Sequence, residues 1–406
     1  MNYNQRVLHI DNVEQAKQEL KKINCDPTGV AIMAQKAVFK LVKLEHVPTK
    51  AANLLKQTFL AKGGEVALAR ESAALSIEYT DVLLCATLKQ YRLALAQLKL
   101  QPWGLPDIAA VIEAVLIQDE TFPHRKYVWP HHSLSLKPGK TLVMGILNLT
   151  PDSFSDGGRN NHLDAALRQL EQMLQGGADI IDVGVESAKP YGGSRTLSAE
   201  EEMQHLLPIL GKILEVSPVP VSIDTYRAEV ADAALNLGAH MLSNIWGLQH
   251  DRDMAVVAAK YKVPVIITHN RTIADYTGDM MDEIVGFLKE SIAIAQGAGV
   301  GRDQIIVDPG IGFAKTTEHN LLIMSRLEEL KSLNCPVLLG SSRKRFIAEV
   351  LDFPVEQRVE GTGAAVVVGI TKGVHIVRVH DVKSIKRMTE MTDAMLLKQR
   401  FFHPFQ

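Results

Sequence analysis

Eight short apolar segments recur through the last two-thirds of this chain of 406 residues, and nearly every one ends in a residue able to do chemistry. Continuous runs of Val, Ile and Leu between polar residues are typical of buried parallel strands. The segments are Leu142–Leu147, Ile180–Val183, Val219–Ile223, Met241–Leu242, Val263–Thr268, Ile305–Val307, Val337–Leu339 and His375–Val377. Helical patterns separate them, so the series predicts a closed parallel (β/α)8 barrel. Such a barrel carries its active site at the carboxyl ends of the strands.

The expected helices rest on amphipathic spacing and on capping residues, as where Ser198 and Glu201 form a capping-box pattern. They span about residues 162–176, 198–215, 226–237, 251–260, 281–297, 317–333, 343–351 and 357–372. The chain is therefore predicted to be an α/β protein with a TIM barrel over residues 141–406.

The part of the chain before the barrel has a different pattern. Residues 1–118 mix strand and helix signals, with strands expected at Val38–Val47, Glu65–Ala69 and Asp81–Thr87, and they predict a smaller mixed α/β domain. Residues 119–140 hold three prolines, three histidines and no periodic apolar face, which is typical of a linker. No nucleotide fingerprint or histidine cluster assigns a role to the first domain.

Composition narrows the class of partner. A net charge of −2 gives no reason to expect a nucleic acid or an anionic membrane as partner. No apolar run reaches the roughly 18 residues that span a bilayer, and the N-terminus lacks the pattern of a signal peptide. Cys25, Cys85 and Cys335 form no CxxC pair and are expected to be reduced. We expect a cytoplasmic protein that acts on small molecules.

Two carboxylates end apolar strands, at Asp224 and Asp308. A buried carboxylate needs a paired or hydrogen-bonding partner, and a heterocycle with a ring N–H and an exocyclic amine can satisfy one in bidentate fashion. The glycines Gly310 and Gly312 let the backbone approach a flat ligand closely. The alternative is that one aspartate caps the following helix, and Asp224 is the stronger candidate for that.

A basic cluster, Gly340-Ser-Ser-Arg-Lys-Arg345, follows the seventh strand and forms a candidate anion site at a helix start. Arg378 and His380 alternate along the last strand and share one face. With Lys344 they can hold a diphosphate. The alternatives are a solvated basic turn, and metal ligation by His269 and His380.

The loop after the first strand carries Asn148, Asp152 and Asp156. Asn148 can supply an oxygen ligand to a hard cation from a rigid strand end, and the two aspartates can close over a substrate. The alternative is that the residues of this loop form ordinary turns, for which their sequence is also typical.

Taken together, these segments resemble dihydropteroate synthase over about residues 140–395. The matching motifs, in family order, are Gly145–Gly158, Ile181–Gly184, Ser222–Thr225, Asp308–Phe313, Ser342–Lys344, Arg358–Thr362 and Ile376–Asp381. The resemblance implies a TIM-barrel enzyme of folate biosynthesis. It condenses a dihydropterin methyl diphosphate with p-aminobenzoate, with Mg²⁺ assisting, and it usually forms homodimers. The first 120 or so residues look like the extra domain of some bacterial members.

The resemblance also implies roles for individual residues. Asp224 and Asp308 match the pterin-binding carboxylates and Lys344 the lysine that contacts the pterin, whereas Arg378 and His380 match the diphosphate-binding pair. Asn148 matches the Mg²⁺ contact. The other implied substrate contacts are Asp152, Phe154, Lys189, Pro190, Ser243, Asn244, His269, Ser342 and Arg343.

Several positions depart from the family pattern, all near the implied pterin or diphosphate. Ala188 and Lys189 replace a threonine and an arginine, and Lys189 offers a point charge instead of a planar fork. Ser243 replaces an asparagine, and Asn244 replaces an aspartate. These changes keep two alternatives open: a non-catalytic or regulatory pterin-binding paralogue, and a pterin-dependent methyltransferase module.

Overall fold

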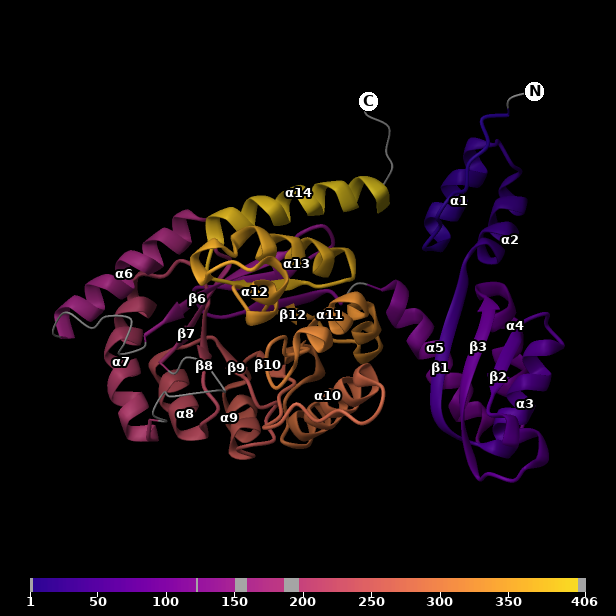
Figure 1. Ribbon diagram of the computed structural model, residues 1–406, viewed down its shortest axis with the longest axis horizontal. Helices are drawn as coiled ribbons and strands as arrows, with labels where there is room; N and C mark the ends of the chain where they lie inside the picture. Colours follow the sequence, from indigo (N-terminus) through magenta and orange to yellow (C-terminus); the bar gives the residue numbers. More distant parts are fainter. Residues whose placement is uncertain (1–2, 122, 150–158, 186–196, 401–406) are drawn as a thin grey trace. The chain divides into compact units, whose positions relative to one another are not determined.

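The computed structural model describes residues 3–121, 123–149, 159–185 and 197–400, and the chain forms two compact units (Figure 1). The first unit is Met1–Thr121 and the second is Phe122–Gln406. Among the described residues, no helix is both long enough and apolar enough to cross a membrane.

The first unit is a mixed α/β domain, as expected. Its antiparallel sheet has the order β1-β3-β2, and the buried face packs on helices, with Leu55, Phe59, Leu84 and Tyr91 in the core. The sequence did not predict α2, whose N-cap Asp26 accepts from the backbone of Thr28. The elements are α1 (Val13–Lys22), α2 (Pro27–Ala37), β1 (Phe39–Pro48), α3 (Thr49–Leu60), β2 (Glu65–Leu68), β3 (Tyr79–Thr87), α4 (Leu88–Leu98) and α5 (Leu105–Glu120).

The second unit contains the predicted barrel. Eight parallel strands pair in the order β11-β10-β9-β8-β7-β6-β13-β12, and a parallel bridge between Val307 and Val337 closes the ring. The strands are β6 (Leu142–Asn148), β7 (Ile180–Gly184), β8 (Val221–Asp224), β9 (Met241–Asn244), β10 (Val265–Thr268), β11 (Ile305–Asp308), β12 (Leu338–Leu339) and β13 (Ile376–Val379). Each expected strand is present, with small differences at its ends.

Helices lie around these strands (Figure 1), and outward Val, Ile and Leu side chains of the strands pack against them in one apolar cluster. They are α6 (Arg159–Gln175), α7 (Ala199–Val216), α8 (Ala228–Leu237), α9 (Asp253–Tyr261), α10 (Met280–Gly297), α11 (Thr317–Ser325), α12 (Arg345–Leu351), α13 (Val359–Thr371) and α14 (Val382–Arg400). The sequence predicted one helix over 317–333, but α11 ends at Ser325 and a 3₁₀ segment, Leu327–Leu333, follows. It missed α14.

The segment predicted as a linker is not one. An antiparallel hairpin, β4 (Arg125–Val128) and β5 (Ser133–Leu136), forms there. Its Tyr127, Leu134 and Leu136 join the lower layer of the barrel interior in one apolar cluster. The hairpin thus closes the amino-terminal end of the barrel.

A chain of histidines fastens the hairpin to the barrel. The backbone N–H of Val221 donates to Nδ1 of His240 over 3.1 Å, and Nε2 of His240 lies 3.1 Å from Nδ1 of His132. Nε2 of His132 lies 3.1 Å from the carbonyl of Ser217. Since each Nδ1 accepts, each ring carries its proton on Nε2. Burial, then His132, lowers the pKa of His240 to about 4.

Candidate active site

The barrel interior changes from apolar to polar along the strands. Ile180, Ile306 and Ile376 belong to the lower interior layer. Side chains two residues further along a strand share the same face, so Asp182, Asp308 and Arg378 point inward above that layer. The polar layer lies toward the carboxyl ends of the strands, where a barrel enzyme binds its substrate.

Arg378 lies between two carboxylates of this layer. Its Nε donates to Asp182 Oδ2 over 2.6 Å, and its Nη2 donates to Asp224 Oδ2 over 2.5 Å. Burial raises the pKa of Asp224 to about 6, although Arg378 opposes the shift. Burial also opposes the charge of Arg378, but the carboxylates of Asp182 and Asp224 outweigh it and raise the pKa of the guanidinium. Asp224 therefore pairs with a cation, and the cap of α8 is Arg227 instead.

Asp308 lies at the start of a glycine loop, which we define as residues 308–315. Its Oδ1 accepts from the backbone N–H of Gly310 over 2.8 Å. Burial raises the pKa of Asp308, with the Gly310 N–H and then Lys344 opposing. Asp308 caps no helix among the described residues; it closes the loop turn and keeps its Oδ2 for a ligand.

Lys344 reaches back over this loop. Its Nζ lies 4.2 Å from the centre of the Phe313 ring, and a Cβ on Gly312 would come within 2.8 Å of its Cδ. Gly312 has φ +81°, so a side chain there would be both strained and obstructed. Burial lowers the pKa of Lys344 to about 8, and Arg378 contributes in the same direction. The interior holds Asp224, Asp308, Lys344 and Arg378 together.

His380 contacts Ser342 through both its backbone and its ring. Ser342 Oγ accepts from the backbone N–H of His380 over 3.1 Å and lies 3.0 Å from its Nδ1. In the tautomer with its proton on Nε2, the ring accepts from the Ser342 hydroxyl at Nδ1 and offers the Nε2 proton to an anionic ligand. Burial, followed by Arg343 and Arg378, lowers the pKa of His380 to about 4. The ring is neutral and donates one hydrogen bond.

Arg343 forms hydrogen bonds with neighbouring residues of the protein through both its side chain and its backbone. Its guanidinium binds Asp381 in bidentate fashion, at 2.9 and 2.6 Å, and its backbone has φ +56°. The Thr362 hydroxyl accepts from its N–H, and Arg358 donates to its carbonyl. These bonds fix the turn that presents Ser342 and Lys344.

Ser243 and Asn244 lie on opposite faces of β9. Ser243 pairs in register with Asp224 and shares the inward face with Met241. Asn244 shares the outward face with Leu242, and its Oδ1 accepts from the backbone of Trp246 and Leu248, both over 3.0 Å. A turn therefore uses the amide oxygen of Asn244, while its buried Nδ2 has no partner in the described residues; that this residue contacts the substrate stays a prediction.

Sequence reasoning missed two charged residues of the site, Asp182 and Lys315. Asp182 is fully buried within an apolar strand. Because an unpaired charge there is costly, a lone aspartate in such a strand indicates a charged partner. Lys315 Nζ lies 2.8 Å from Nδ1 of His269. Four predicted substrate contacts, Asp152, Phe154, Lys189 and Pro190, lie outside the described residues, as do Asp156 and Ala188.

Asn148 ends β6 in register with Gly184 of β7 and is partly exposed. The described residues hold no cluster of three or more His, Cys, Asp or Glu that would ligate a metal. Magnesium usually takes one or two protein oxygens and completes its shell with water and substrate phosphates. The amide oxygen of Asn148 fits that limited role.

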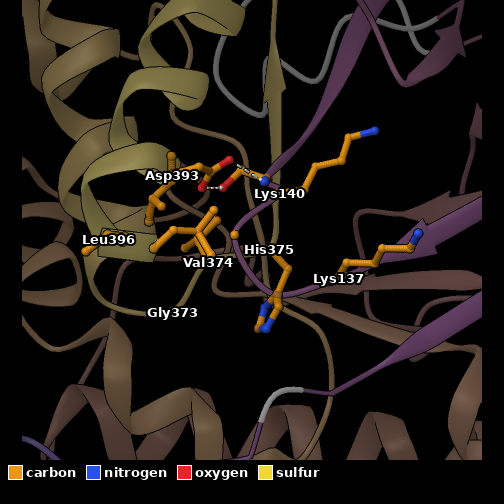
Figure 2. Close-up of a pocket in the computed structure, with 11 residues that line it drawn as sticks. Lys137, Lys140, Gly373, Val374, His375, Asp393 and Leu396 are labelled. Atoms are coloured by element: carbon orange, nitrogen blue, oxygen red, sulfur yellow. Dashed lines mark hydrogen bonds between the residues drawn. The ribbon is translucent and has the colours of Figure 1, made fainter. Parts of the chain in front are cut away.

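A small pocket of about 50 Å³ lies at the opposite end of the barrel, before β6 and β13 (Figure 2). Its carboxylate, Asp393, accepts from the backbone N–H and the hydroxyl of Thr141 over 2.6 and 2.8 Å. The carboxylate is thereby used to hold α14 against the start of β6, so we interpret the pocket as structural.

Comparison with known proteins places the chain among pterin enzymes. Residues 144–380 match the family model described as pterin binding enzyme. Dihydropteroate synthase of Bacillus subtilis is 52% identical over 264 residues, which are 65% of this chain and 92% of that protein. A probable bifunctional folylpolyglutamate synthase/dihydropteroate synthase of Halobacterium salinarum is 36% identical over 380 residues, 92% of this chain and 45% of that protein. That match extends through most of the first unit.

Solved structures that resemble the chain belong to the same kind of enzyme. Dihydropteroate synthase of Clostridium difficile, determined in the presence of pteroic acid, superposes with a TM-score of 0.62 at 46% identity, over 64% of this chain and 98% of that one. The Xanthomonas albilineans enzyme with 4-aminobenzoic acid gives a TM-score of 0.64 at 34% identity, over 67% of this chain and 98% of that one.

Proposed function

Since the chain belongs to the pterin-binding enzyme family, we infer that it is a dihydropteroate synthase, an alkyl transferase of folate biosynthesis. The observation that carries this function is the convergence of Asp224, Asp308, Lys344 and Arg378 inside one barrel end. Its substrates are the dihydropterin methyl diphosphate and p-aminobenzoate, and its products are 7,8-dihydropteroate and diphosphate.

The charges of the site match the charges of this reaction. The carbon–oxygen bond of the pterin methylene breaks and its electron pair leaves with the diphosphate. The amine of p-aminobenzoate then forms the carbon–nitrogen bond and releases a proton. Arg378, Lys344 and the Nε2 proton of His380 stabilise the leaving anion, whereas the carboxylates of Asp224 and Asp308 bind the N–H groups of the pterin and stabilise its developing positive charge.

We propose that Mg²⁺ assists, held by Asn148 and by oxygens of the diphosphate. When bound, the ion neutralises part of the diphosphate charge. Support comes from the chemistry of the donor, an amide oxygen at the end of a rigid strand beside Gly184. The proposal also places the reaction in the cytoplasm, where Cys25, Cys85 and Cys335, free in the structure, stay reduced.

We further propose a homodimer that forms over α13 and α14. A groove on these helices is lined by Val367, Ser384, Arg387, Met388, Met391, Thr392 and Met395. Met391 and Met395 are 62% and 52% exposed, and such apolar side chains in a patch favour association.

Sedimentation of the double variant Met391→Asp/Met395→Asp should give a monomer, whereas Leu321→Asp on α11 should leave the dimer intact. A monomeric wild type would refute the dimer.

The decisive assay is turnover of the purified full chain with the pterin diphosphate, p-aminobenzoate and Mg²⁺, following diphosphate release and pteroate formation together. Product that depends on both organic substrates supports the synthase. Pterin diphosphate that binds without turnover would favour the second candidate, a non-catalytic pterin-binding paralogue. The short side chain of Ser243, opposite Asp224, is the observation that keeps this candidate in the test.

A further inference from the structure

Lys315 is a charged residue beside the site that the reaction above leaves without a role. It ends the glycine loop, and its Nζ donates to the carbonyl of Phe313 over 3.0 Å. The same atom lies 2.8 Å from Nδ1 of His269 and 3.5 Å from the carbonyl of that residue. One ammonium group therefore ties the loop after β11 to the end of β10.

The loop and the strand end are in close contact apart from Lys315. The backbone N–H of His269 donates to the carbonyl of Asp308 over 3.0 Å. Gly310 has φ +70°, and a Cβ at that position would lie 1.9 Å from the carbonyl oxygen of His269. The loop backbone thus rests directly on β10. Any loosening at Lys315 would change the position of Asp308, whose carboxylate is held by the Gly310 N–H.

Four ionisable groups of the described residues face Lys315. Burial lowers the pKa of Lys315 to about 7; Asp308 of β11 opposes this shift, and Lys344 and Arg271 contribute to it. Burial, then Lys315 and Arg271, lowers the pKa of His269 to about 2, so this ring is neutral. Its Nδ1 accepts from Lys315 and its Nε2 carries the proton. Asp308 is the anion that the ammonium balances.

We propose that Lys315 is a positioning residue for pterin recognition: its ammonium holds the glycine loop against β10 and keeps the carboxylate of Asp308 ionised for the N–H groups of the ring. This role rests on the proposed function, since it requires that Asp308 bind a pterin. It differs from the role of Lys344, whose side chain lies against the Phe313 ring and Gly312 of the same loop.

The proposal makes pterin affinity depend on pH in a defined direction. Protonated Lys315 stabilises ionised Asp308, and ionised Asp308 accepts the ring N–H groups. As pH rises through about 7, Lys315 loses its proton, so the affinity for the ring falls on the alkaline side. Lys344 titrates near pH 8 and adds to the fall. The variants Lys315→Met and Lys315→Arg, in which only Lys344 can titrate, separate the contributions of the two lysines to this fall in affinity.

The test is calorimetric titration of the full chain with 6-hydroxymethyl-7,8-dihydropterin, which lacks the diphosphate and reports on the ring alone, between pH 6 and 9. Lys315→Met should raise the Kd at least about tenfold at pH 6, as expected for loss of a hydrogen-bonded charge, and remove the decline in affinity near pH 7, which leaves only the fall near pH 8 that Lys344 contributes. Lys315→Arg carries a cation that does not titrate, so its affinity should stay constant through pH 7 and fall only near pH 8, with Lys344. Lys289→Met, on the exposed surface of α10, is the matched control and should behave as wild type.

Each outcome is decisive. A wild type whose affinity for the ring is constant from pH 6 to 9 overturns the proposal without any variant, and so does Lys315→Met with the wild-type affinity and pH profile. A change in the KM for p-aminobenzoate instead of the pterin would also overturn it. If wild type binds no pterin at pH 6, the proposed function fails before the role of Lys315 is in question.

Discussion

Lys344 is the residue whose removal should separate chemistry from folding most clearly. Its side chain crosses Gly312 and contacts the face of Phe313, and no hydrogen bond that stabilises a helix or strand depends on it in the described residues. Lys344→Ala should lower kcat by about 10² to 10³, the usual effect of removing one preorganised charge from a site, with a melting temperature near that of wild type. Steady-state kinetics and circular dichroism test both. Turnover within a few-fold of wild type would refute the assignment.

Ser243 tests which pterin the site accepts. It points inward opposite Asp224 on the neighbouring strand, and its hydroxyl is shorter than the asparagine amide of the family pattern, with fewer donors. Ser243→Asn should lower the KM for the standard pterin diphosphate if that is the substrate. Asn244→Asp, which changes a side chain on the outward face, is the control and should leave this KM unchanged. An increased KM in Ser243→Asn would point to a different ring or a reshaped pocket.

Residue by residue, the sequence predicts the groups that lie at strand ends and misses the groups that depend on long-range pairing. Asp224, Asp308 and Arg378 could be predicted because each ends or continues an apolar run, and a barrel brings such positions together. Asp182 could not be paired from sequence, because its partner Arg378 lies 196 positions away. Lys315 fits no phosphate-loop motif, and its partner His269 belongs to another strand, so no local pattern indicates its contact.

At the scale of elements, the hairpin β4–β5 is the main difference from expectation. Its strands have four residues each, too few for a periodic apolar face, and the prolines and histidines between and around them are typical of turns. Only the barrel interior reveals their function, because Tyr127, Leu134 and Leu136 fill its lower end. Local sequence patterns do not predict short strands whose stability comes from residues far away in the sequence.

The contact between His132 of this hairpin and His240 of the barrel predicts how the fold responds to acid. In the unfolded chain His240 takes up a proton near pH 6.5, whereas in the folded chain it does so near pH 4. A depressed folded pKa stabilises the fold above pH 6.5, and this stabilisation is lost as the pH falls toward 4. The loss is on the order of 3 kcal/mol. The free energy of unfolding, measured with urea at a series of pH values from 7 to 4, should fall by this amount.

The control for this prediction is an exposed histidine. His240→Leu should flatten the acid dependence of unfolding free energy, whereas His205→Leu, on the exposed face of α7, should keep the wild-type slope. Equal slopes in wild type and His240→Leu would mean that other groups govern the acid response.

At the scale of the whole molecule, the two units have separate cores. The core of the first unit runs from Val42 to Ile112, and the lower interior of the barrel begins with Tyr127 of the hairpin. The two-part organisation was predictable, because the βα alternation starts only at Leu142. The point of division was not, since the hairpin belongs to the barrel although its composition is that of a linker.

This division predicts where the chain can be shortened. A chain of residues 122–406 keeps the hairpin and every described residue of the site, so it should fold and retain turnover within about threefold of the full chain, because the barrel then keeps its buried core. A chain of residues 137–406 loses Tyr127, Leu134 and Leu136, each worth about 1.5–3 kcal/mol when buried. That loss is comparable with the whole stability of a typical domain, about 5–15 kcal/mol, so this shorter chain should not melt cooperatively.

Turnover and thermal melting of the two chains, which differ by the hairpin and its flanking residues alone, test the argument. If the chain of residues 122–406 melts cooperatively but is inactive, the first unit contributes to the reaction itself. If the chain of residues 137–406 melts like the longer one, the hairpin is dispensable for closing the barrel.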